Sequence, residues 1–109
     1  MKKADTMQGS LDLLVLKVLS RQPKLHGYAI MMAIKQTSGD VLNAEVGSLY
    51  PALHRMEQSG WVRAEWAVTE SSRRAKFYTL TAAGRKQLVA REKNWEQVAK
   101  GVQAILRFA

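Results

Sequence analysis

The stretch VGSLYPALHRMEQSGW, residues 46–61, decides how the centre of this chain folds. Three apolar residues recur in it at helical spacing, at Leu49, Leu53 and Met56, so that one face of a helix would carry all of them. Gly60 follows the last turn, where helices commonly end. The pattern therefore predicts a helix with a buried face on one side and a polar, acid-poor surface on the other.

Pro51 stands in the first half of this predicted helix. Proline has no N–H, and its ring crowds the carbonyl four residues earlier, which belongs to Gly47. If Asn43 is the N-cap, Pro51 falls near the end of the second turn and a small kink follows. If the helix starts at Ser48, Pro51 lies among the donors that have no helical partner anyway. We favour Asn43, because the apolar spacing then holds over residues 44–56.

Two further helices are predicted upstream. Residues 7–20 would form the first, with Ser10 as its N-cap and Asp12 near the positive end of the helix dipole. The second runs from about residue 27 to 37, and Gly39 is the expected left-handed residue after its end. The apolar residues of the first helix form a wide face: Leu11, Leu14, Val15, Val18 and Leu19.

The second half of the chain begins with two β-rich segments. Residues 61–68 and 76–81 flank the polar loop TESSRRA, which is the pattern of a β-hairpin. Thr81 would then cap a long helix that ends near residue 107. Three short helices, a hairpin and a long helix make a mainly α fold, the winged helix-turn-helix. We expect a DNA-binding domain at residues 1–81 and a dimerisation helix at 82–109, in one compact unit.

The chain is strongly basic, with 17 Lys and Arg against 9 Asp and Glu in 109 residues, a net charge of +8 and a pI of about 10.1. Such an excess favours a polyanionic partner, nucleic acid before membrane. No apolar run is long enough to span a bilayer, and the two N-terminal lysines precede no hydrophobic signal segment. Cysteine is absent, which fits the reducing cytoplasm.

Side chains suited to DNA lie on the 46–61 helix and on the hairpin loop. The helix offers hydroxyl, phenol, imidazole and guanidinium groups, which can bind phosphates and base edges; they belong to Ser48, Tyr50, His54 and Arg55. The loop offers three cations for the DNA backbone, Arg73, Arg74 and Lys76. Each could instead be an ordinary solvent-facing residue, but their joint occurrence in this layout favours DNA contact.

An enzyme or a metal site is not expected. The only histidines are His26 and His54, neither is in a Ser-His-Asp or metal-ligand pattern, and the carboxylates are scattered. His26 precedes a predicted helix and should cap it or pack there. No catalytic residue, metal or cofactor is therefore predicted.

The last helix carries an apolar stripe longer than a small winged domain needs. Leu88, Trp95 and Val102 follow at seven-residue steps, with Val98 and Ile105 between them. Soluble monomers avoid leaving such a stripe exposed. We expect a homodimer interface in which the stripe packs on its own copy and on Leu11, Leu14 or Val18 of the first helix. Folding back on its own core is the alternative.

Four segments resemble the PadR family of winged-helix transcriptional regulators: LDLLVLKVLS, HGYAI, GSLYPALHRMEQSGWV and RRAKFYTLTAAGR, in register over about residues 8–92. The chain resembles the short branch, which has a single C-terminal helix. The resemblance implies a homodimer, usually a repressor, with Tyr50 and Ser48 on the recognition helix. It also implies a basic wing at Arg73, Arg74 and Lys76. Ser72 stands where the family usually has a glycine, so the wing turn is expected to differ.

In some short members the last helix lines a cavity between subunits that takes up flat apolar compounds against a tryptophan. Trp95 stands at the matching place, so the resemblance implies a small aromatic effector there, although an interface anchor is the simpler role. The expected function is a dimeric repressor that binds a near-palindromic operator in double-stranded DNA. The alternative is a basic module that binds nucleic acid without sequence preference, or another partner, and senses no effector.

Overall fold

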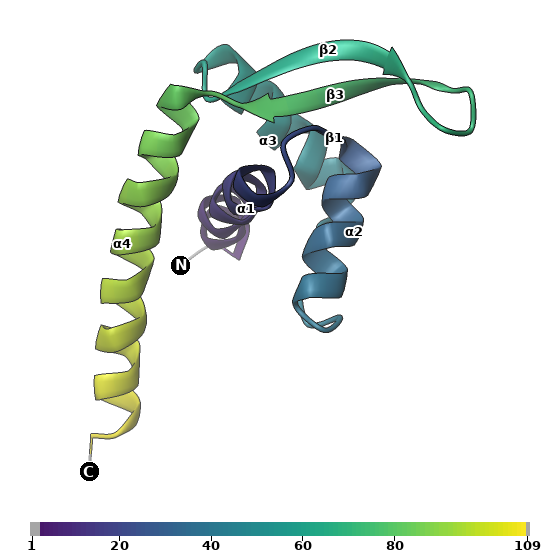
Figure 1. Ribbon diagram of the computed structural model, residues 1–109. Helices are drawn as coiled ribbons and strands as arrows, with labels where there is room; N and C mark the ends of the chain where they lie inside the picture. The colour runs from purple at the N-terminus through teal and green to yellow at the C-terminus, as the bar shows by residue number, and fades with distance from the viewer. Residues whose placement is uncertain (1–2, 109) are drawn as a thin grey trace.

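The computed structural model describes residues 3–108, with side chains from Ser10 onward. Three helices form a cluster beside a small antiparallel sheet, and a long last helix packs along the first helix with its N-terminal half and projects beyond the cluster (Figure 1). In chain order the elements are α1 (Lys3–Arg21), β1 (Leu25–His26), α2 (Gly27–Thr37), α3 (Val46–Gln58), β2 (Val62–Val68), β3 (Arg74–Leu80) and α4 (Ala82–Leu106). The molecule is elongated, 58 × 28 × 25 Å. The mainly helical winged fold predicted from the sequence is confirmed.

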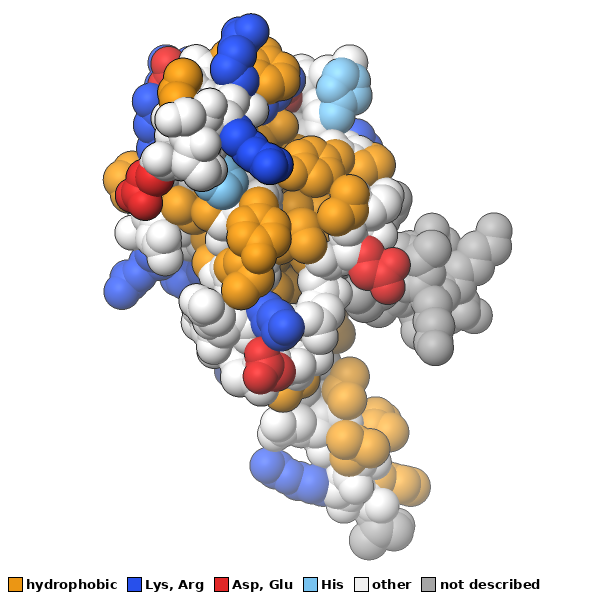
Figure 2. Space-filling model, turned by 90° about the vertical axis from the view of Figure 1, so that its right-hand side faces the viewer, with side chains coloured by type: hydrophobic (Ala, Val, Ile, Leu, Met, Phe, Trp, Pro, Cys, Tyr) orange, Lys and Arg blue, Asp and Glu red, His pale blue; other side chains and the backbone are white. Residues whose placement is uncertain are grey.

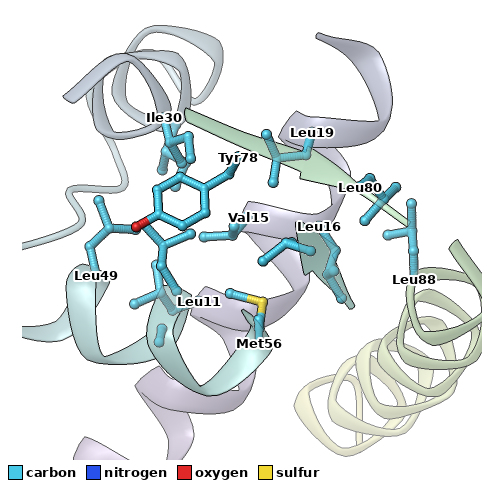
Figure 3. Packing of buried hydrophobic residues seen from close by; sticks show 14 residues of the cluster. Leu11, Val15, Leu16, Leu19, Ile30, Leu49, Met56, Tyr78, Leu80 and Leu88 are labelled. Carbon is cyan, nitrogen blue, oxygen red and sulfur yellow. The ribbon is translucent and has the colours of Figure 1, made fainter. Parts of the chain in front are cut away.

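The hydrophobic core lies where the first three helices meet the sheet. The wide apolar face of α1 is at its centre, and Val15, Leu16 and Leu19 are almost inaccessible to solvent (Figure 3). The buried face of α3 is the predicted one, with Leu49, Leu53 and Met56, to which Ala52 is added. Burial of these apolar side chains is the main force that fixes α3 against α1.

Helix α2 has the predicted bounds. His26 caps it, because its Nδ1 accepts the N–H of Ala29 at 3.2 Å, and Gly39 follows with a positive φ of 62°. The prediction for α1 was wrong at its start: the helix begins at Lys3, so Ser10 lies inside it and is not the N-cap. No proline stands between Lys3 and Ser10 to interrupt the helical backbone.

Helix α3 begins at neither predicted residue. Glu45 is its N-cap, without a side-chain hydrogen bond, and Val46 is the first helical residue. Asn43 and Ser48 are therefore both wrong as starting points. Pro51 is inside the helix, where it cannot donate to the carbonyl of Gly47. The proline thus removes one helical hydrogen bond, as expected for a helix that starts before Ser48.

The sheet has three strands in the order β1-β3-β2, one more than predicted. The additional strand, β1, pairs Leu25 with Tyr78 and His26 with Phe77. Strand β3 begins earlier than expected, at Arg74, so Arg74 lies in a strand and not in the loop. Lys76, which was named both with the loop cations and as the start of the predicted strand, lies in the strand. The loop prediction was wrong there because Arg74 pairs with Val68 across the hairpin.

The start of α4 is fixed to the end of α3. Thr81 caps α4 as predicted, accepting the N–H of Gly84 at 3.0 Å. The Thr81 hydroxyl donates to the carbonyl of Gly60 at 2.6 Å, and its backbone N–H donates to that of Trp61 at 3.0 Å. A Cβ at Gly84 would overlap the Trp61 carbonyl, and the guanidinium of Arg91 lies 4.9 Å from the centre of the Trp61 ring. Helix α4 therefore leaves the domain at a fixed position.

Candidate nucleic-acid interface

A cleft of about 1140 Å³ opens between the hairpin, which forms the wing, and the helices α2 and α3. The wing contributes aromatic, aliphatic and basic side chains, and the helices contribute two tyrosines. Hydrophobic side chains gather at the centre of this face, with basic side chains around them (Figure 2). The residues that matter here are Tyr28, Tyr50, Trp66, Val68, Arg73 and Arg74.

Strand alternation explains the apolar lining of the wing. Side chains two residues apart share one face of a strand, and Val62 on β2 is buried against the core. Trp66 and Val68 share that face but extend beyond the core, and both are largely exposed. The guanidinium of Arg74 lies 5.3 Å from the centre of the Trp66 ring, within cation–π range. The indole thus holds this arginine at the mouth of the cleft.

Tyr50 projects from α3 into the same cleft. It is about 43% exposed, and its ring lies against Gly27 at the first turn of α2. A Cβ at Gly27 would overlap the phenol oxygen, so glycine there makes room for the ring. Ser48 and His54 are also exposed on α3. The structure therefore brings Tyr50 close to the wing, and it leaves these two neighbours open to solvent.

Arg55 is engaged with α1. Its Nη2 donates to Oδ1 of Asp12 at 3.0 Å, and Asp12 is buried. A buried carboxylate needs such a partner, because an unpaired charge in the protein interior is costly. The Arg55 side chain is still 42% exposed, and guanidinium carries further donors. Asp12 therefore acts in holding α3 to α1, which is a different role from the helix-dipole role suggested by its sequence position.

Lys76 is also paired. Its Nζ donates to Oε1 of Glu57 at 3.0 Å, and this hydrogen bond raises the pKa of Lys76 above its usual value. The pair joins the wing strand β3 to α3. At the end of the wing, by contrast, Arg73 and Arg74 are exposed, and no carboxylate among the described residues forms an ion pair with either. At the end of the wing, these two arginines are therefore available to a phosphate.

Sequence reasoning missed four residues of this interface. Trp66, Val68 and Tyr28 line the cleft, and Asp12 holds Arg55. For Trp66 a signal was present: it lies on the same strand face as Val62 but too far along the hairpin for the small core to cover it. No local pattern could have paired Asp12 with a residue 43 positions away.

The residues predicted for the dimer interface divide between the core and the surface. Leu11 and Leu88 are buried in the core of the single chain, and Leu14 and Val18 are partly buried against it. These residues contribute to the fold of one chain. Four members of the stripe are about half or more exposed on the projecting part of α4: Trp95, Val98, Val102 and Ile105. Between the last three lies a shallow apolar hollow, bordered by Gly101 and Leu106.

The described side chains include no cluster of three or more potential metal ligands. Within the same part of the chain, none of the helices combines the length and the apolar character that a membrane crossing requires.

The fold and the sequence both have known relatives. The structure of a transcriptional regulator from Clostridium thermocellum superposes with a TM-score of 0.84 at 23% identity, over 94% of this chain and 99% of that one. The chain is 46% identical over 77 residues to a 37.1 kDa transposon protein of Streptomyces fradiae, and 29% identical over 70 residues to the negative transcriptional regulator PadR of Bacillus subtilis. These matches cover 71% and 64% of this chain.

The chain spans only 20% and 38% of the length of those two relatives. Residues 15–90, which make up most of the chain and include α3 and the whole wing, match the transcriptional regulator PadR-like family. The chain therefore belongs to the PadR family of transcriptional regulators and has its winged-helix DNA-binding fold.

Proposed function

We propose that this chain is a homodimeric repressor that binds a near-palindromic operator in double-stranded DNA and acts in the cytoplasm. One observation carries the proposal: Tyr50 of α3 and the free arginines of the wing, Arg73 and Arg74, border a single cleft. A recognition helix and a wing that face the same way can hold one DNA strand between them. The family of the chain and its net charge of +8 support this proposal.

In this mode α3 lies in the major groove and the wing leans over the adjacent backbone. Ser48, Tyr50 and His54 face the groove, with Arg55 at the flank where Asp12 holds it. Arg73 and Arg74 bind phosphates, or enter the minor groove beyond them. Trp66 and Val68 supply an apolar wall for the sugar faces of the strand in the cleft. Lys76 contributes less directly to DNA binding, because it already forms an ion pair with Glu57.

Dimerisation is proposed through the exposed part of α4. Trp95, Val98, Val102 and Ile105 form one stripe, and covering it would remove a sizeable apolar surface from water. A second copy packed on this stripe places two recognition helices about a two-fold axis. Half-sites about one helical turn apart, ~34–36 Å, then match the dimer.

An effector site is proposed at the same interface. Trp95 is 51% exposed in the single chain, and between two copies its indole offers a flat surface on which a planar aromatic compound can stack. Binding there would act on the dimer and so on the spacing of the recognition helices. Quenching of tryptophan fluorescence in wild type, absent from Trp95→Phe, would identify this site, provided the dimer itself persists.

The function is tested by selection from a random duplex library at about 150 mM salt, followed by a salt titration on the winning sequence. Enrichment of a two-fold site with half-sites about one turn apart supports a sequence-specific dimeric regulator. If binding is steeply salt-dependent but no sequence is enriched, the basic surface grips phosphates alone and the repressor proposal fails. Tyr50→Ala should weaken the selected site while leaving the thermal unfolding midpoint nearly unchanged.

A further inference from the structure

The residues of α3 that point directly away from the core are not the same set as its polar residues. The buried residues of α3 define its inner side, and the positions opposite follow at steps of four, three and four. All four are exposed, and they are Gly47, Pro51, His54 and Gln58. Tyr50 lies toward one edge of this stripe and Arg55 toward the other. The first half of the stripe, Gly47 and Pro51, thus contains no polar side chain.

Pro51 has no role in the core that would explain its place. Proline is the least favourable residue inside a helix, because it removes a hydrogen bond and crowds the preceding turn. A buried proline could offset this by packing, but Pro51 is exposed to solvent. What its ring presents to the outside is a rigid apolar surface without any polar group. On a basic domain, such a surface is suited to contact an apolar group that lies among phosphates.

Gly47 gives this surface low relief. A Cβ built there would have no neighbour within 4 Å, so packing inside the chain does not require glycine. Its φ is not in the left-handed region either, and glycine weakens a helix relative to alanine. A glycine at such a position allows another molecule to approach the backbone closely. Gly47 and Pro51 together form a shallow apolar strip beside Tyr50.

We propose that Pro51 reads thymine in the operator by contact with its C5-methyl group, and that Gly47 lets α3 approach the bases closely enough for this contact. Thymine methyl groups are the apolar features of the major groove, and small apolar side chains are their usual partners. His54, the next member of the stripe, then faces the neighbouring base pair with its imidazole. The inference rests on the proposed function, since it requires α3 in the major groove.

The test compares thymine with deoxyuridine, which lacks only the methyl group. In the duplex obtained by selection, each thymine is replaced in turn, and dissociation constants are measured by fluorescence anisotropy. For wild type we expect at least one symmetric thymine whose replacement weakens binding about fourfold, the effect of exposing one methyl group. With Pro51→Ser, binding to the thymine duplex falls and this thymine/deoxyuridine ratio returns to one. The serine restores the N–H, so the variant should be at least as thermally stable as wild type.

His54→Ala is the matched control. It removes a neighbouring polar contact of the same stripe, so affinity falls but the thymine/deoxyuridine ratio stays near fourfold. A wild type that is indifferent to every methyl group would overturn the inference, as would a Pro51→Ser variant that keeps the ratio. Both outcomes leave sequence-specific binding intact, whereas the absence of any selected sequence removes the proposed function and this inference with it.

Gly47→Leu tests the close approach separately. A Cβ at this position meets no atom within 4 Å in the free protein, and leucine favours a helix, so the unfolding midpoint should rise or stay the same. Bound to the selected duplex, the side chain collides with the bases, and we expect at least a tenfold loss of affinity. Unchanged affinity for this variant would show that α3 does not approach the bases at Gly47.

Discussion

Ser72 holds the turn of the wing in the left-handed region, with φ at 63°. A side chain with a Cβ is strained there by about 1 kcal/mol, whereas glycine is not. We expect Ser72→Gly to raise the free energy of unfolding by about that amount, measured by urea denaturation. Ser71→Gly is the control in the same turn, because Ser71 has no positive φ; it should be neutral or destabilising. Equal effects of the two variants would mean that the strain at Ser72 is negligible.

The position of the Tyr50 ring depends on the absence of a side chain at Gly27. In Gly27→Ala the new methyl group overlaps the phenol, and the ring must swing away from its position beside the wing. We expect operator affinity to fall about tenfold, comparable to losing one base contact, and Tyr50→Ala to have a similar effect. The double variant should be no weaker than Tyr50→Ala alone. If Gly27→Ala costs as much in the Tyr50→Ala background as in wild type, displacement of the ring is not the cause.

At the scale of elements, two exposed valines on different faces of α4 allow the proposed interface to be tested. Val102 belongs to the stripe, and Val89 is also exposed but lies about 140° away around the helix. Val102→Glu should convert the dimer to monomer in sedimentation velocity, because it places a charge in an apolar contact. Val89→Glu should remain dimeric. A dimer that survives Val102→Glu would exclude this stripe as the interface.

The sequence predicted elements well wherever the pattern is local. The apolar spacing of α3, the cap of α4 at Thr81 and the alternation in the hairpin all depend on neighbours within a few residues, and these were confirmed. Strand β1 was missed because two residues are too few to show the alternation of a strand. Leu25 is part of a strand only because it pairs with Tyr78. The start of α3 was missed because Glu45 caps it without any side-chain hydrogen bond.

The candidate site was predictable in composition and less so in arrangement. The residue types on α3 and the wing indicated a polyanionic partner. Ion pairs within the chain, however, already engage two of these cations. Arg55 bonds to Asp12 and Lys76 bonds to Glu57, and each pair joins two elements that are distant in the sequence. Periodicity predicts the face on which a residue lies, but it does not predict which residue of another element will pair with it. The cleft beneath Trp66 likewise exists only once the wing is placed over α2 and α3.

For the whole molecule, the wing arginines should dominate the salt dependence of binding. Each phosphate contact adds about 0.9 to the slope of log affinity against log salt. The proposed dimer carries two copies of each arginine, so Arg73→Ala with Arg74→Ala should lower the steepness of this slope by about 3.6, or about 1.8 per subunit, equally for operator and unrelated duplexes. Lys76→Ala should change it less, because Glu57 already neutralises Lys76. Titrations that show the same slope for wild type and the double variant would place the phosphate contacts elsewhere.

The rigid joint between Thr81, Gly84 and Trp61 has a consequence for how such a protein can change in length. Because these contacts hold the base of α4, every residue inserted between Arg91 and Trp95 turns the stripe by about 100° relative to the exposed face of α3. One extra residue rotates the stripe away from the second copy, while seven extra residues return it to within about 20° of its original direction. Operator spacing can therefore change only through insertions that keep the stripe near its original direction, such as seven or eleven residues, each of which leaves it about 20° away.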